Sequence, residues 1–263
     1  MRGYVTLFAM HVRSPDRSAD LPPADPLLRA GLSRTSTPKR AGAPAGQRHE
    51  GCTMRKILVA NPKGGCGKST IAVHLASWFA MNDEVVFIGD LDRQQSSRHW
   101  LDLRPPSQPK IHHWEPTDEL VAPPKGCSVA IFDTPAGLHG KRLKQLLGEV
   151  DRVIVPVSPS RFDMMASRDF FEELAQVKAV RKDRVGVGIV GMRVDARTNS
   201  SRELVDFLEQ FELPLLTCLR STQRYVRALE SGVTLFESSD AAAAIDRLQW
   251  QPLLEWLVTR RAS

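Results

Sequence analysis

The chain has 263 residues, 42% of them apolar and 25% charged, which is typical of a globular protein with one substantial core. Four scattered cysteines without C-x-x-C pairing argue against a cysteine zinc site and a disulfide framework, and they fit a reducing cytosol. No apolar run reaches the roughly 18 residues of a membrane span. The formal net charge of +6 permits a polyanionic partner without indicating one.

Residues 1–53 differ in composition from the rest of the chain. They contain six of the 18 prolines and eight basic against four acidic residues, and no hydrophobic period is sustained after Tyr4–Met10. We expect a disordered tail, or an extension upstream of a true start at Met54; a targeting peptide is the alternative. The folded domain is therefore expected over residues 54–263.

From Lys56 onward, short β-rich runs alternate with amphipathic helical patterns. Strands are expected over residues 56–62, 84–92, 127–135, 152–158, 185–194 and 213–219, and helices over 68–81, 141–150, 167–180, 201–211, 222–232 and 245–258. The proline-rich residues 104–126 are expected to form a surface insertion with one edge strand. Continuous Val/Ile strands between such helices indicate an α/β fold, with a mostly parallel twisted sheet and helices on both faces.

A glycine-rich loop, NPKGGCGKST over residues 61–70, joins the first strand to the first helix. Small residues let backbone N–H groups surround phosphate oxygens, and the strand–loop–helix context is that of a P-loop NTPase. Lys68 should reach the β- and γ-phosphates, Ser69 should bind Mg²⁺, and Thr70 should bond near the α-phosphate. The residues assigned to nucleotide binding here are Gly64, Gly65, Cys66, Gly67, Lys68, Ser69 and Thr70. A glycine turn without a nucleotide is the alternative.

The loop departs from the G-x-x-x-x-G-K-[ST] pattern in two ways. Pro62 stands where the first glycine belongs, and Lys63 adds a second lysine beside the glycines. Three carboxylates, Asp90, Asp92 and Asp133, follow other strands at the same edge of the expected sheet. Each could merely cap a turn or helix, but together they suggest a magnesium–nucleotide site, with ATP and Mg²⁺ as cofactors.

The motifs KGGCGKST, DLDRQQSS and FDTPAG resemble the deviant Walker A, Walker A′ and Walker B motifs of the ParA/MinD family of P-loop ATPases. The likeness extends over essentially all of residues 54–263. It implies an ATP hydrolase that pairs with a second copy around ATP, with Lys63 reaching the nucleotide of the other subunit. Lys63, Lys68 and Asp92 would then be catalytic, with Asp92 orienting the attacking water.

The same resemblance assigns the remaining site residues. Asp90 would support the magnesium shell, and Asp133 would hold a magnesium-bound water. Adenine would lie near Met192 and Arg193 and near the loop around Cys218–Arg220.

ParA-like members bind DNA without sequence preference, whereas the MinD branch binds a membrane. Arg220, Arg224 and Arg227 recur at spacings of four and three, so we expect them on one helical face and assign them to DNA binding. The basic residues between 178 and 184 are a second candidate. A solvated helix face is the alternative for both groups.

The apolar C-terminal segment, residues 245–258, is the candidate for a membrane. Ile245, Leu248, Leu253 and Trp256 would share one helical face, which a bilayer or the domain core could cover. Pro252 interrupts the helix and the polar positions are not a row of lysines, so we expect core packing and no membrane partner.

The resulting hypothesis is a cytoplasmic, nucleoid-associated ATPase of the ParA type, acting as an ATP-dependent homodimer on non-specific DNA. The stretches ANPKGG, DLDRQQSS and WQPLLEWL look most like orphan members that space protein bodies. A ParB-like or cargo adaptor protein would stimulate hydrolysis. The cargo would be a plasmid, a chromosome, or a body such as a carboxysome or chemoreceptor cluster. A MinD-like regulator of division-site placement is the alternative.

Overall fold

The computed structural model describes residues 54–117 and 122–259, so the predicted tail at residues 1–53 lies outside the described part. One seven-stranded sheet runs in the order β3-β2-β4-β1-β5-β6-β7, and all adjacent strands are parallel. The strands are β1 (Arg55–Val59), β2 (Val86–Asp90), β3 (His112–Trp114), β4 (Val129–Asp133), β5 (Arg152–Val157), β6 (Gly186–Val194) and β7 (Leu215–Arg220). The parallel α/β fold is thereby confirmed.

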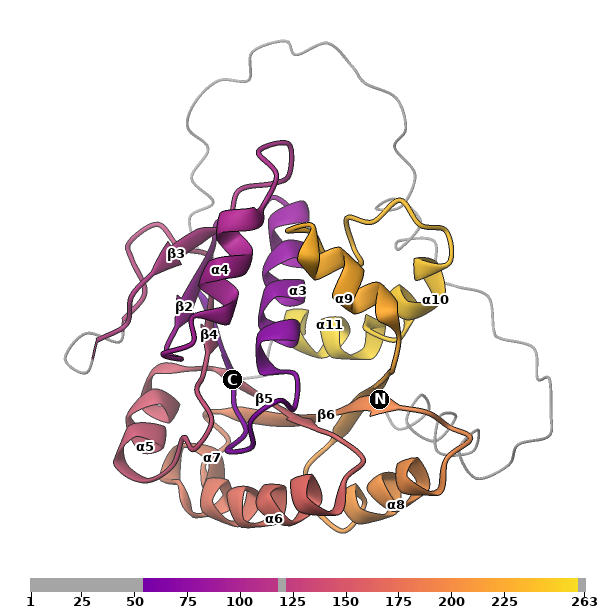
Figure 1. The fold of residues 1–263 in the computed structure, drawn as a ribbon. Helices are drawn as coiled ribbons and strands as arrows, with labels where there is room; N and C mark the ends of the chain where they lie inside the picture. Colours follow the sequence, from indigo (N-terminus) through magenta and orange to yellow (C-terminus); the bar gives the residue numbers. More distant parts are fainter. Residues whose placement is uncertain (1–53, 118–121, 260–263) are drawn as a thin grey trace.

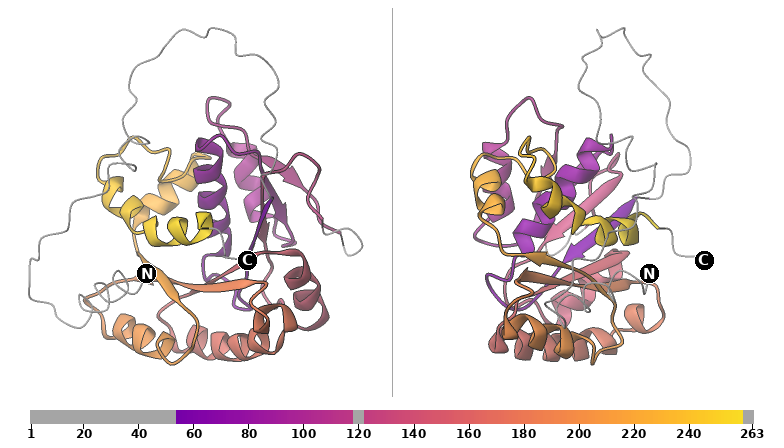
Figure 2. Two further views of the ribbon diagram at one scale, coloured as in Figure 1. Left: turned by 180° about the vertical axis from the view of Figure 1, so that it is seen from behind. Right: turned by 90° about the vertical axis from the view of Figure 1, so that its right-hand side faces the viewer.

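Helices cover both faces of this sheet (Figure 1). One layer contains α5 (Gly140–Glu149), α6 (Arg161–Gln176), α7 (Lys178–Arg181) and α8 (Asn199–Leu208). The other contains α3 (Lys68–Met81), α4 (Ser96–Leu103), α9 (Gln223–Glu230), α10 (Ala243–Leu248) and α11 (Gln251–Val258). Figure 2 shows the same two layers from behind and from the side.

The central strand β1 shows how the core is divided. Successive side chains of a strand point to opposite faces, so Leu58 joins the cluster beneath α5–α8. Ile57 and Val59 join the cluster beneath α3 and the C-terminal helices. Burial on both faces explains the continuous apolar sequence, and it fixes the carboxyl end of β1, where the glycine-rich loop begins.

The predicted helix over residues 167–180 differs from the structure. Helix α6 begins at Arg161 rather than at residue 167, because the Ser160 hydroxyl accepts a hydrogen bond from Asp163 N–H (3.4 Å) and caps an additional first turn. It ends at Gln176, and α7 is a separate short helix. Helix α4 was not expected from the sequence, whereas the edge strand within residues 104–126 is confirmed as β3.

The C-terminal segment forms two helices instead of one. Pro252 lies in the first turn of α11, where proline is tolerated. The expected single apolar face is wrong: Ile245 and Leu248 are 61% and 57% exposed, whereas Trp250 and Leu253 are fully buried. Core packing is therefore correct for α11. None of the helices in the described residues is both long and apolar enough to cross a membrane.

Candidate nucleotide site

The glycine-rich loop connects β1 to α3 through two left-handed glycines. Gly65 has φ +72° and Gly67 has φ +100°, which side chains rarely adopt. A Cβ on Gly67 would also come within 2.6 Å of the Met192 Cε atom, so β6 packs directly behind the loop. Both glycines are required by the conformation that turns the backbone into the helix.

Asn61 holds the start of the loop in place, a role that the motif analysis missed. Its buried side chain accepts a hydrogen bond from Lys63 N–H (2.8 Å) and donates to Pro156 O (2.8 Å) and Ser167 Oγ (3.0 Å). Asn61 thus ties the loop to β5 and α6. The sequence did offer a sign of this role: Asn61 is a polar residue directly after a buried apolar strand, and a buried polar side chain needs hydrogen-bond partners.

The two lysines of the loop occupy different environments. Lys68 is only 7% exposed, and its Nζ donates to Lys63 O (2.8 Å). Lys63 itself has an exposed side chain and does not line the cavity beside the loop. Cys66 is buried, with its Sγ 3.3 Å from Lys63 O, and burial raises the pKa of this thiol. Lys68 therefore contacts the loop and lines the cavity of its own chain, whereas Lys63 is exposed outside that cavity.

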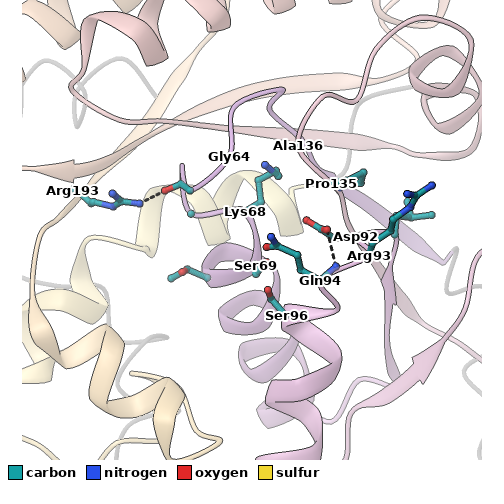
Figure 3. Close-up of a pocket in the computed structure, with 14 residues that line it drawn as sticks. Gly64, Lys68, Ser69, Asp92, Arg93, Gln94, Ser96, Pro135, Ala136 and Arg193 are labelled. Atoms are coloured by element: carbon teal, nitrogen blue, oxygen red, sulfur yellow. Dashed lines mark hydrogen bonds between the residues drawn. The ribbon is translucent and has the colours of Figure 1, made fainter.

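A cavity of about 730 Å³ lies beside the loop (Figure 3). In the close-up, Arg193 lies on one side of the loop, and Asp92 and Pro135 lie on the other. The cavity is lined by Gly64, Gly65, Gly67, Lys68, Ser69, Thr70, Leu91, Asp92, Arg93, Gln94, Ser96, Pro135, Ala136 and Arg193. Its size and its polar loop suit a nucleotide.

Asp133 is a buried carboxylate without a hydrogen-bond donor among the described residues. It is 1% exposed at the end of β4, and neither of its oxygens accepts a hydrogen bond. Burial raises its pKa to about 7, although the nearby Ser69 hydroxyl opposes that rise. An orphaned carboxylate next to a loop serine fits a hydrated Mg²⁺, which usually takes one or two protein ligands besides phosphates and water. Ser69 and Asp133 would hold it.

Asp90, expected in the magnesium shell, is already engaged by protein donors. One oxygen accepts from Asp92 N–H (2.9 Å), and the other accepts from Ser97 N–H (3.1 Å), Ser97 Oγ (2.8 Å) and Arg98 N–H (3.2 Å). Its carboxylate anchors the start of α4 and positions the backbone of Asp92. The magnesium role of Asp90 stays a prediction.

Asp92 lines the cavity and is partly exposed. Its Oδ1 accepts from Gln94 N–H (3.0 Å), within a turn that continues through Gln95, whose φ is +49°. Arg93 and Gln94 from this turn, and Ser96 at the start of α4, also line the cavity and were not predicted. The sequence showed that these residues belong to the DLDRQQSS motif, but only the folded structure shows which of their side chains line the cavity.

Only some of the residues predicted to contact adenine line the cavity. The Arg193 guanidinium lines it and donates to Gly65 O, on a backbone with φ +54°. Met192 is buried behind Gly67, and Cys218 is buried within β7; neither lines the cavity. Their assignment to adenine stays a prediction without support from the cavity.

The predicted arginine face is wrong in one member. Arg220 is the last residue of β7, so it does not lie on α9 with Arg224 and Arg227. Its Nε is paired with the buried Asp246, and Arg224 is paired with Asp240 at 3.0 Å. Arg227 is exposed. The strand extends further than expected, which removes the 220–224 spacing from any helix.

Comparison with known proteins agrees with this geometry. Residues 57–235 match the family described as the CobQ/CobB/MinD/ParA nucleotide binding domain. The chain belongs to this family. It is 27% identical over 188 residues to the maintenance of carboxysome distribution protein A of Halothiobacillus neapolitanus, an alignment covering 69% of this chain and 86% of that protein. The resemblance to the ParA/MinD family is thus confirmed.

Two further known proteins resemble the chain. The chain is 27% identical over 181 residues to the chromosome-partitioning ATPase Soj of Thermus thermophilus, covering 55% of this chain and 72% of Soj. Its fold matches the ATP complex of a Cyanothece McdA variant with a TM-score of 0.63 at 14% identity, covering 81% of this chain and 100% of that one. At this identity the structural match shows the fold alone.

Proposed function

We propose that this protein is a ParA-type ATPase whose ATP-bound dimer binds DNA without sequence preference and positions a cargo. The observation that carries the proposal is the separation of the two loop lysines. Lys68 is buried at the cavity, whereas Lys63 is exposed and does not line it. Because the ammonium group of Lys63 is not used in its own cavity, it is free to reach the phosphates of a second copy. There it would neutralise transition-state charge, as an arginine finger does.

The residues at the cavity have complementary roles in this scheme. The loop N–H groups and Lys68 bind the β- and γ-phosphates, and Mg²⁺ supplies neutralisation of their charge when it is bound. Asp92 lines the cavity and has one oxygen that accepts no hydrogen bond from the described residues, which supports the role of orienting a water. Hydrolysis would be slow until a partner protein completes the site.

The cargo is inferred from the relatives. The match to a carboxysome-distribution protein covers most of both chains, so a protein body is the favoured cargo, with partitioning of DNA close behind. The membrane alternative loses its main support, because Trp250, Leu253 and Leu257 of the C-terminal segment are buried in the core. The stimulating partner is an adaptor carried by the cargo.

DNA binding by the full chain tests this function. Affinity for a random-sequence duplex should be high with a non-hydrolysable ATP analogue and weak with ADP. Arg227→Glu combined with Arg224→Gln should abolish it; glutamine is chosen at 224 because a glutamate would face Asp240 and the buried Asp246. The salt dependence of any residual binding should also be weaker, because fewer cations then neutralise phosphates.

The second candidate for DNA binding, the basic residues between 178 and 184 on the other layer of the molecule, provides a matched comparison. Lys178 and Lys182 lie at the two ends of α7 and are both exposed. Lys178→Glu with Lys182→Glu makes at least as large a charge change, and this protein should still bind DNA. Equal affinity in ATP and ADP, or unchanged affinity after the α9 substitutions, would contradict the proposed function.

A further inference from the structure

Four ionised side chains gather where β7 ends and α9 begins. Asp246 lies in α10 and its side chain is fully buried, with Arg220 Nε paired to one oxygen and Arg224 Nη1 3.5 Å from the other. Arg224 also pairs through Nε with Asp240 Oδ2 at 3.0 Å. Both arginine side chains are about one-third exposed, so they share a buried carboxylate and still reach the surface.

The two carboxylates of this cluster differ in how readily they can separate from the arginines. Asp246 is buried, so separating it from its arginines would leave an unpaired charge in the protein interior. Asp240 has a side chain that is 48% exposed, and only its Oδ2 contacts Arg224. Its Oδ1 accepts a separate hydrogen bond from Ala242 N–H (2.8 Å), which fixes the turn before α10. Asp240 can therefore release Arg224 without unfolding its own turn.

We propose that Asp240 occupies, on Arg224, the position that a DNA phosphate takes in the complex. This inference rests on the proposed DNA-binding function and adds a regulatory element to the same surface. Carboxylate and phosphate oxygens are the two acceptors that guanidinium groups bind most strongly, so they compete for the same donors. Asp240 thereby lowers DNA affinity, and DNA has to displace it.

The expected size of the effect follows from the exposure of the pair. An exposed ion pair contributes little, so displacing Asp240 should weaken DNA binding about threefold to fivefold per protomer. In a dimer that places both α9 faces on one duplex, the factor applies twice.

Asp240→Asn tests the proposal, because asparagine keeps an oxygen for Ala242 N–H while removing the charge. The full chain, loaded with a non-hydrolysable ATP analogue, is titrated against a labelled random-sequence duplex at about 0.1 M salt, where charges remain partly screened. Glu212→Gln is the matched control: Glu212 is exposed and precedes β7 at the end opposite Arg220, and its removal changes the net charge equally.

Asp240→Asn should bind DNA about tenfold more tightly than the parent, and Glu212→Gln less than twofold more tightly. In an Arg224→Gln background the advantage of Asp240→Asn should fall to that of the control. Equal effects of Asp240→Asn and Glu212→Gln, with parental DNA binding intact, would overturn the competition and leave the proposed function standing. Failure of both the parent and Asp240→Asn to bind duplex would overturn both.

Discussion

His74 of α3 stacks on Trp250, with the two ring centroids 5.0 Å apart and the planes 12° from parallel. The imidazole Nε2 accepts from Leu235 N–H (3.3 Å), so its Nδ1–H donates to Thr70 O (2.8 Å). Trp250 Nε1 donates in turn to Tyr225 of α9 (2.9 Å). A buried, hydrogen-bonded stack thus joins the helix that follows the phosphate loop to the C-terminal helices.

Trp250→Ala should destabilise the domain by about 3–5 kcal/mol, the usual cost of removing a large buried aromatic side chain. Leu248→Ala is the matched control from the same segment, because Leu248 is 57% exposed, and it should cost under about 0.5 kcal/mol. Urea-induced unfolding at neutral pH measures both. Similar losses for the two variants would mean that the C-terminal segment is not part of the core.

His74 should make stability fall in mild acid. Burial lowers its pKa from 6.5 to about 4, so the unfolded chain takes up the proton first as the pH falls. The stabilising contribution is complete above pH 6.5 and is lost as the pH approaches 4. About 2 kcal/mol of it should be lost by pH 5.

His74→Phe keeps an aromatic ring against Trp250 but does not titrate. It should be less stable than the parent at pH 7.5, because Leu235 N–H loses its acceptor, and its unfolding free energy should change less between pH 7.5 and pH 5. Urea unfolding at the two pH values gives this difference. Parallel pH profiles for parent and variant would rule out His74 as the source.

The sheet and the phosphate loop could be predicted from sequence because they depend on local patterns. Buried Val/Ile runs are typical of strands in a parallel sheet, and the Gly64–Ser69 stretch is recognised by its glycines and lysine between one such strand, β1, and the helix α3. The two-sided core follows from the same alternation of strand side chains. These features were therefore correct without any knowledge of long-range contacts.

Features set by distant contacts could not be predicted in this way. Asn61 bonds to residues about one hundred positions away, and Asp90 accepts hydrogen bonds from the first turn of a helix of only eight residues. Arg220 was placed on a helix because its spacing fits one, yet β7 extends through it. In each case the tertiary neighbour, rather than the local pattern, decides what the side chain does.

Asn61→Ala should weaken nucleotide binding by about tenfold or more, because Lys63 N–H loses its acceptor and the loop loses its tie to β5 and α6. Asn82→Ala is the control: Asn82 is an exposed asparagine whose amide donates to Trp78 O beyond the far end of α3. Titration with a fluorescent ATP analogue measures both variants. An Asn61 variant with parental affinity would show that the loop is held in shape without it.

Asp92→Ala should lower ATP turnover by about 100-fold or more while leaving ATP-dependent pairing intact, since a residue that orients water acts only in the chemical step. Asp102→Ala removes a more exposed aspartate, at the other end of α4, and should have no effect. Steady-state phosphate release is measured alongside sedimentation with ATP. Retained turnover without Asp92 would assign the water to another residue.

Lys63→Gln gives the most direct test of the proposed sandwich dimer. The variant should bind ATP with nearly parental affinity, because Lys63 does not line the cavity of its own chain, but it should neither pair nor hydrolyse in the presence of ATP. Lys68→Gln should instead lose ATP binding itself. Sedimentation velocity with ATP measures pairing of both variants, and a turnover assay measures their ATP hydrolysis. Parental pairing and turnover in the Lys63 variant would contradict the account.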